Sequence, residues 1–171
     1  MKNIVYVVLA VIVFTSCQNQ SKIGFVNNGT VINDFQEKKD LETKFQEKEE
    51  VFRKKYDSIG KAFQFEAQKI QARAKRSSQK KAQEMMGELQ QKNQQLSQQM
   101  QMEQQQLQGE FQTEIDSVIV KVKDFVKDYG KTNGYTYILG TSDAAATVMY
   151  GSDENDLTQT ILDLLNKDTK E

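Results

Sequence analysis

More than a hundred consecutive residues, from Thr30 to Thr132, contain no proline and are rich in Gln, Glu, Lys and Ala. These are good helix formers, and apolar residues recur among them at steps of three and four. Only 37% of the chain is hydrophobic, less than in most compact domains, and 27% is charged. The stretch therefore predicts long helices in an extended protein rather than a globular enzyme.

Short segments of a different character flank this stretch. Alternating and aromatic residues predict strands, and Asn28-Gly29 predicts a turn after the first of them. Near the carboxyl end an amphipathic helix is expected, with Asp156 as its N-cap and Gln159 placed for a near capping box. The expected segments are strands at Lys22–Asn27, Tyr135–Leu139 and Thr147–Tyr150, and a helix at Asp156–Asn166.

If the terminal strands share a sheet, the helical middle must leave and return as a hairpin. We expect its turn near residues 84–88, because Gly87 is the only glycine between residues 61 and 108. Facing apolar residues such as Phe52 and Val118 then have numbers that add to 170. A sum of 163 also gives apolar pairs, because heptad-like patterns match themselves after a slip of seven.

The predicted fold class is thus α+β and mostly α. A small β-rich body, formed by residues 22–35 and 133–171, carries a long antiparallel helical hairpin of coiled-coil type at residues 36–132. Within the arm, Gly60 and Gly109 have numbers that add to 169, so we expect them at nearly the same height. They are candidates for a shared hinge or for a close helix crossing that needs small residues.

The amino terminus reads as an export signal. A basic start precedes eleven apolar residues, Ile4 to Phe14, which are too few to span a membrane and suit a secretory signal. Small residues and Cys17 follow, and this order resembles a bacterial lipoprotein signal. Residues 1–16 would then be removed, Cys17 would carry lipid and residues 17–21 would be a tether. The alternative is cleavage near Ser16 with Cys17 left as a free or intermolecularly oxidised thiol.

The two ends carry a family resemblance. Four terminal segments together resemble the OmpH/Skp family of periplasmic chaperones. They are the strand-like I-x-x-V-N-x-G at Ile23 to Gly29, the segment Tyr135 to Leu139, the Ala/Val/Tyr run around Ala145 to Tyr150, and the helix start Asp156-Leu157-Thr158. The resemblance implies homotrimers whose arms enclose a cavity and hold unfolded outer-membrane proteins without ATP. It implies a periplasmic location, here with a lipid anchor in a bacterial membrane. The lipoprotein-type signal and the eleven glutamines in residues 90–108 depart from the soluble members.

A basic cluster is the main candidate for client binding. Six cations and no acid lie between Lys69 and Lys81, and residues 36–83 hold fourteen Lys or Arg against eight Asp or Glu. The cluster would attract acidic clients or anionic lipid head groups, or it would only keep a solvated helix soluble. Neighbouring methionines can adapt to varied partners. The candidates are Lys69, Arg73, Lys75, Arg76, Lys80, Lys81, Met85 and Met86.

Trimerisation is expected to reside in the body, which is too small for a large core of its own. The candidate contact residues are Ile23, Phe25, Tyr135, Tyr137, Ile138, Val148 and Tyr150.

Several function classes are excluded or disfavoured. The chain has no His, which removes imidazole catalysis and common zinc sites, and it shows no phosphate-binding or nucleophile motif. We expect no enzyme, no cofactor and no metal. The net charge of −1 and the export signal argue against nucleic acid. The alternative to a chaperone is a structural spacer or adaptor of the bacterial envelope.

Overall fold

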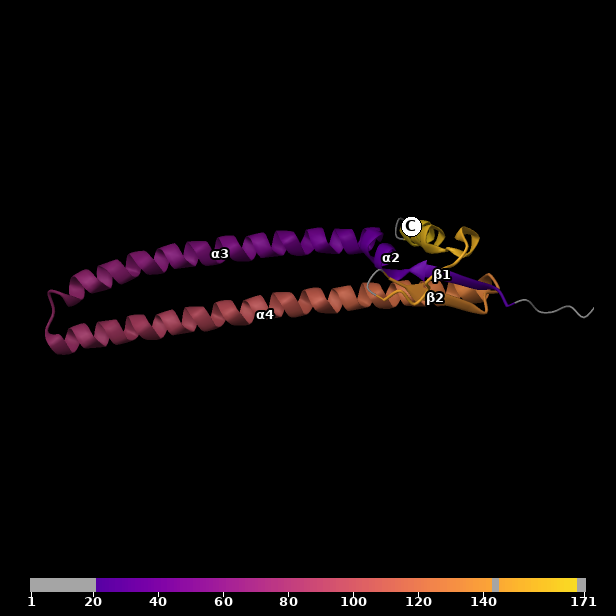
Figure 1. Cartoon of the computed structure of the whole chain (residues 1–171). Helices are drawn as coiled ribbons and strands as arrows, with labels where there is room; N and C mark the ends of the chain where they lie inside the picture. Colours follow the sequence, from indigo (N-terminus) through magenta and orange to yellow (C-terminus); the bar gives the residue numbers. More distant parts are fainter. Residues whose placement is uncertain (1–20, 143–144, 169–171) are drawn as a thin grey trace, which may run out of the picture.

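The computed structural model describes residues 21–142 and 145–168, and in these the chain forms a long helical arm on a small body (Figure 1). The arm is α3 (Gln36–Ala74) and α4 (Gln79–Thr132), which run antiparallel side by side. The predicted signal and Cys17 lie outside the described residues. The body consists of β1 (Ile23–Asn27), α2 (Asn28–Asp34), β2 (Tyr137–Thr141), the 3-10 turn η1 (Asp153–Asn155) and α5 (Thr158–Asp168).

The two strands form a parallel sheet in which Ile23 is opposite Tyr137 and Asn27 is opposite Thr141. The expectation that both ends share a sheet, with a helical hairpin between them, is therefore confirmed. The second strand lies two residues later than predicted. The predicted strand at Thr147–Tyr150 is wrong, because the other edge of β1 is already occupied: Leu157 N donates to Phe25 O at 2.9 Å.

The body is also less β-rich than predicted, since two five-residue strands accompany α2 and α5. Its core is formed by the inner face of the sheet and by these two helices, where Val26, Val31, Phe35, Ile161 and Leu165 are almost completely buried. A Cβ at Gly24 would lie 2.6 Å from the side chain of Leu157. Only glycine fits at this close approach.

The predicted turn at Asn28-Gly29 is instead the first turn of α2. Asn27 has an extended backbone, and its Oδ1 accepts a hydrogen bond from Thr30 N at 3.1 Å. This is an N-cap, which satisfies one of the free amide groups at the start of a helix. The sequence signal was thus a helix start rather than a loop.

Helices α3 and α5 meet at the base of the arm. Phe35 is extended and fully buried, so α2 ends there and α3 begins anew. Gln36 N donates to Asn166 Oδ1 at 2.8 Å, so α5 supplies the cap that α3 lacks in its own sequence. The predicted capping box of α5 does not form: Asp156 Oδ1 accepts from Thr158 N, but Gln159 bonds Asp163.

The turn of the hairpin lies between α3 and α4 at residues 75–78, not at residues 84–88 as predicted. Two serines make it. Ser77 Oγ donates to Arg73 O at 2.9 Å, and Ser78 is extended at the N-cap position of α4. Gly87 lies inside α4, where a glycine costs only about 1 kcal/mol relative to alanine.

The register of the two helices differs accordingly. Five ion pairs join α3 to α4, and the residue numbers of each pair add to 158: Lys44–Glu114, Lys48–Glu110, Lys55–Glu103, Glu66–Lys92 and Glu37–Lys121. The rings of Phe45 and Phe111 are tilted against each other with their centres 5.0 Å apart, and these two residue numbers add to 156. Both predicted sums, 170 and 163, are wrong. Relative to the sum of 156 for the Phe45–Phe111 pair, the predicted sum of 170 is too large by two heptads and the predicted sum of 163 by one heptad.

Candidate functional site

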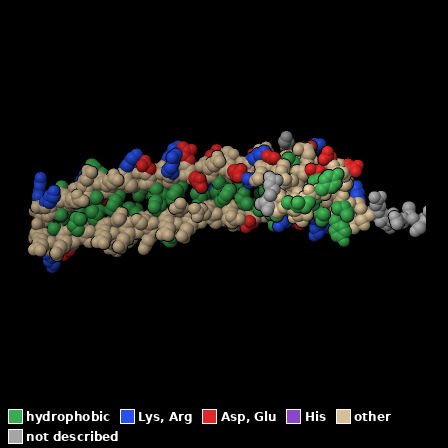
Figure 2. Space-filling view, viewed as in Figure 1, with side chains coloured by type: hydrophobic (Ala, Val, Ile, Leu, Met, Phe, Trp, Pro, Cys, Tyr) green, Lys and Arg blue, Asp and Glu red, His purple; other side chains and the backbone are tan. Residues whose placement is uncertain are grey.

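The arm changes along its length in how well its interior is filled. Near the body, Leu41, Phe45, Val118 and Val122 are buried between α3 and α4. Beyond them, Leu89 is the one buried residue in the region 46–117. Figure 2 shows green apolar side chains along the seam between the two helices, much of it open to solvent. The outer arm is therefore a pair of helices with a thin and accessible apolar seam.

Ion pairs link the two helices across this seam. Lys55 Nζ lies 2.6 Å from Glu103 Oε2, and Lys48 Nζ lies 2.9 Å from Glu110 Oε2. The bond from Lys55, and next that from Gln99, lowers the pKa of Glu103 below its ordinary value. Lys48 and Gln106 do the same for the pKa of Glu110. The pairs align the helices, while most of the apolar seam between them stays partly exposed.

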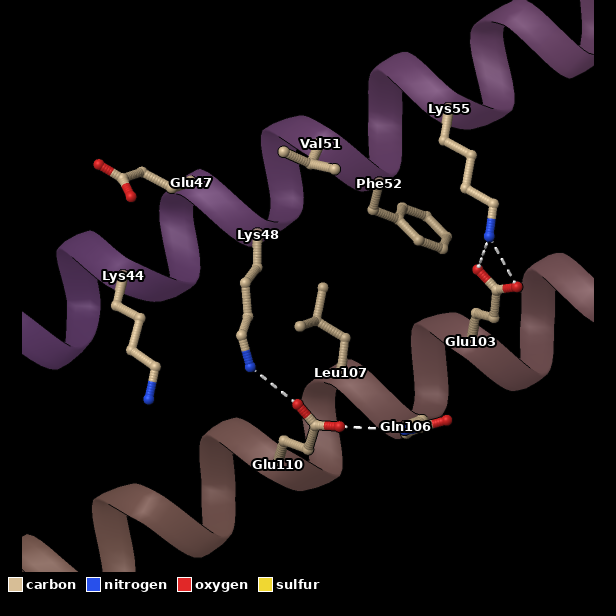
Figure 3. Close-up of a pocket in the computed structure, with 10 residues that line it drawn as sticks. All are labelled: Lys44, Glu47, Lys48, Val51, Phe52, Lys55, Glu103, Gln106, Leu107 and Glu110. Atoms are coloured by element: carbon tan, nitrogen blue, oxygen red, sulfur yellow. Dashed lines mark hydrogen bonds and ion pairs between the residues drawn. The ribbon is translucent and has the colours of Figure 1, made fainter.

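A groove of about 700 Å³ lies at these pairs, in the half of the arm nearer the body (Figure 3). Phe52 from α3 and Leu107 from α4 point toward one another at its floor, and Lys48 and Lys55 reach across to α4. Val51 borders the groove with 67% of its surface exposed. This groove can accept an apolar side chain between charged rims.

A second groove, of about 650 Å³, lies near the turn. Phe63 and Ala67 of α3 and Met86 and Leu89 of α4 contribute apolar surface to it. Of the two predicted methionine contacts, Met86 is 41% exposed and borders the groove, and Met85 is half-buried. Both are in α4, one to two turns beyond its start.

The six predicted cations surround the turn, and the structure brings them together at the free end of the arm. All six side chains are exposed, and within the described chain none of them makes an ion pair. Lys69 Nζ lies 4.2 Å from the ring centre of Phe65. The cluster comprises Lys69, Arg73, Lys75, Arg76, Lys80 and Lys81, and we call it the tip cluster.

Sequence reasoning missed several exposed apolar residues of the arm. Val51, Phe65 and Met102 are 60–67% exposed, although all three are spaced along helices whose apolar residues were read as core. For Val51 and Phe65, the signal that could have found them is their position outside the heptad-like series of Phe45, Phe52 and Ile59 in the same helix. Of the three, Val51 adjoins the groove of about 700 Å³, and exposed apolar side chains gathered at a groove are the kind that mark a contact surface.

The two arm glycines do not face each other, so a hinge shared at one height is wrong. With ion pairs that add to 158, Gly60 is opposite residue 98 and Gly109 is opposite residue 49. A Cβ at either glycine would meet no atom within 4 Å, so a close crossing has no contact to support it. Each glycine remains a possible weak point of its own helix.

The residues predicted for trimer contacts lie on the body, and several are exposed. Ile23, Tyr137 and Leu139 share one face of the sheet by the observed register and are 41–61% exposed. Met149 and Tyr150 are 88% and 89% exposed. Phe25, Tyr135, Ile138 and Val148 are half-buried. The body thus has an apolar surface that its own chain leaves open.

Other kinds of site are not seen in the part of the chain that the structure describes. There, no three His, Cys, Asp or Glu side chains gather as a metal site would require. No helix among residues 21–142 and 145–168 is both long enough and apolar enough to cross a bilayer.

Comparison with known proteins agrees with this architecture. The family model described as outer membrane protein (OmpH-like) matches residues 22–165, nearly the whole described chain. No curated protein matches the sequence. The OmpH-like family is a family of periplasmic chaperones that are not enzymes, and its members form trimers and bind unfolded outer-membrane proteins. On this match over most of its length, the chain belongs to the OmpH-like family.

Proposed function

We propose that this protein is an ATP-independent holdase, which keeps unfolded outer-membrane proteins apart within a cavity formed by the arms of a homotrimer. The observation that carries the proposal is the outer arm, which combines a thin apolar seam, exposed apolar side chains and the tip cluster. Unfolded barrel strands alternate apolar and polar residues and have unpaired edges. Many weak contacts would retain such a client and still let it leave without ATP.

The tip cluster supports early capture. Six exposed cations without ionic partners in the described chain create a positive field at the end of the arm. Such a field raises the rate of encounter with acidic chains more than it raises affinity. We therefore assign the cluster to the capture step and the grooves of the arm to holding.

The exposed apolar face of the body supports assembly into trimers. Ile23, Tyr137 and Leu139 would be covered by neighbouring subunits, together with Met149 and Tyr150. A monomeric body this small buries little apolar area, so association would supply much of its stability.

We further propose that Cys17 carries lipid and anchors the trimer to a bacterial membrane in the periplasm. The support is the order of residues at the amino terminus, a basic start and eleven apolar residues before small residues and the single cysteine. The body rather than the arm would then lie beside the bilayer.

A spacer that only organises envelope components is the other candidate. It would need no exposed apolar side chains along the arm, whereas Val51, Phe65 and Met102 are each at least 60% exposed. This observation and the family favour the holdase.

The test is light scattering of a denatured outer-membrane barrel diluted with and without the protein. We expect suppression of aggregation at near-stoichiometric ratio. Replacing Lys75, Arg76, Lys80 and Lys81 with Gln should slow capture severalfold at low salt and weaken its salt dependence, with helix content unchanged. If the barrel aggregates as fast with the wild-type protein as without it, the holdase proposal is contradicted. If the variant captures clients at the wild-type rate at low salt, the tip cluster has no role in capture and only keeps the arm soluble.

A further inference from the structure

The end of the body where β1 begins carries a second cationic surface. Lys123, Lys127 and Lys131 follow one another at four-residue steps in the last three turns of α4, and all three are exposed. They border a groove of about 360 Å³ between α4 and β2. Among the described residues that line this groove, three are lysines and none is acidic. We call these three lysines the basal lysines.

Aromatic side chains accompany the basal lysines. Tyr135 and Tyr137 line the same groove, and Tyr137 is 61% exposed. Lys22, the last residue before β1, has its Nζ 4.0 Å from the Tyr135 ring centre and 3.1 Å from Asn133 O. Lysine beside tyrosine is the combination that suits the boundary between water and lipid head groups.

The length of the chain before the body limits what this surface can reach. Cys17 and Lys22 are five residues apart, so they are at most ~18 Å apart when fully extended. Strand β1 begins at the end of the body where α4 terminates (Figure 1). A chain held to a bilayer at Cys17 therefore keeps this end of the body beside the head groups.

The tip cluster is in the opposite situation. Helix α4 runs from the turn to the body over 54 residues, which corresponds to ~80 Å. Charges interact through physiological salt over only ~8 Å. When the arm points away from the bilayer, Lys131 lies nearest the surface, Lys123 is ~12 Å farther along the helix, and the tip cluster is far beyond the range of the surface charge.

We propose that the basal lysines, with Lys22, form a docking surface for the anionic lipid head groups of the membrane that holds Cys17. Contact on this side would fix the tilt of the body relative to the bilayer. The proposal uses the proposed attachment at Cys17 for its orientation, but it does not depend on holdase activity.

Neighbouring acidic groups define which side of the body faces the lipid. Asp128 lies 3.3 Å from Lys131, and Asp124 is the other acid in these last turns of α4. Asp153 and Glu154 lie in η1, which contacts β1 rather than the groove beside β2. The face next to α4 should therefore approach an anionic surface.

The test uses the single cysteine of the chain. The mature chain, starting at Cys17, is coupled through that thiol to a maleimide lipid, either in phosphatidylcholine vesicles or in vesicles with phosphatidylglycerol. Lysines are then acetylated briefly and the modified sites are measured by mass spectrometry. We expect acetylation of the basal lysines to fall severalfold in the anionic vesicles only, while Lys75, Lys80 and Lys81 at the tip react equally in both.

Two outcomes would overturn the proposal. In one, the tip lysines are protected as strongly as the basal ones. In the other, the basal lysines react equally in both kinds of vesicle, as they would if a neighbouring subunit covered the groove or if they only stabilised the end of α4.

A variant sharpens the result. Changing Lys123, Lys127 and Lys131 to Gln should weaken the binding of the uncoupled, cysteine-blocked chain to anionic vesicles by about fivefold per lysine. Melting of the variant is measured in parallel. Unchanged vesicle binding by a folded variant would contradict the docking surface, and aggregation assays on the same variant report on the holdase separately.

Discussion

The base and the outer part of the arm are built from the same two helices, yet they differ in how they use apolar residues. At the base, Leu41 and Phe45 pack on Val118 and Val122 out of contact with water. In the outer arm, the apolar seam is narrow, glutamines are frequent, and Phe65 and Met102 are exposed. The comparison teaches that one repeating pattern can build a rigid support at one end and a receptive surface at the other.

The largest expected effect comes from the core at the base. Phe45→Ala removes a ring that is 4% exposed and lies 5.0 Å from the ring of Phe111. We expect a loss of about 3–5 kcal/mol in the free energy of unfolding. Leu96→Ala, at a half-buried position of the outer arm, should cost only about 1–2 kcal/mol. Denaturant unfolding at fixed protein concentration measures both, and equal losses would remove the distinction between the two regions.

This contrast between base and outer arm could be predicted from the sequence only in part. The hairpin and the shared sheet could, because the strand-like ends at Ile23 and Tyr137 flank an uninterrupted helical pattern. The position of the turn could not be predicted, because the only glycine in the region, Gly87, pointed to the wrong place. The turn is instead made by Ser77, whose Oγ donates to Arg73 O, and by Ser78, the extended N-cap of α4. Apolar periodicity also could not fix the register, because it repeats every seven residues.

Charge would have fixed the register where apolar residues did not. The pairs Lys48–Glu110 and Lys55–Glu103 are one heptad apart, so they alone would not exclude a slip of seven residues. Such a slip would separate Glu66 from Lys92, and this third pair therefore fixes the register. For the candidate site, the cationic cluster was visible as a run of charges. The exposure of Val51 was not, since exposure depends on the facing helix.

The arm glycines give a smaller effect of the opposite sign. A Cβ at Gly60 or Gly109 would meet nothing within 4 Å, so each change to Ala should raise the free energy of unfolding by up to ~1 kcal/mol. Gly24→Ala in the body is the matched control. Its Cβ would lie 2.6 Å from Leu157, and it should destabilise.

The same arm variants test the remaining hinge hypothesis. If either glycine is a weak point, spin labels near the turn should report a narrower spread of tip-to-tip distances, and large clients should be held less well. A stable double variant with an unchanged distribution would exclude a hinge at these positions.

The smallest expected effect is that of a single ion pair. Glu103→Gln removes the partner of Lys55 and should lower the melting temperature less than Leu96→Ala does, because the pair is exposed to solvent. Lys54→Gln, whose pair with Glu50 stays within α3, is the control and should leave the contact between the helices unchanged.

Acid titration sharpens this comparison. The pKa of Glu103 and that of Glu110 are lowered in the folded arm from the ordinary 4.5, so their contributions are present above that pH and are lost as the pH falls through the folded values. The pKa of Lys55 is raised from 10.5, so its contribution is lost as the pH rises through the folded value. The melting temperature of Glu103→Gln should therefore fall less than that of the wild type as the pH drops below about 4.5. An identical fall would contradict a stabilising ion pair at Glu103.

Native-state hydrogen exchange, with and without a denatured outer-membrane barrel, tests the central claim most directly. Without client, we expect slow exchange of backbone amides around Phe45 and Val118, where the core is closed, and much faster exchange in residues 60–100. With client bound, protection should increase in residues 60–100 and at the turn, and the base should not change. Uniform exchange along the free arm, or protection gained at the base instead, would contradict a rigid support that carries a receptive outer arm.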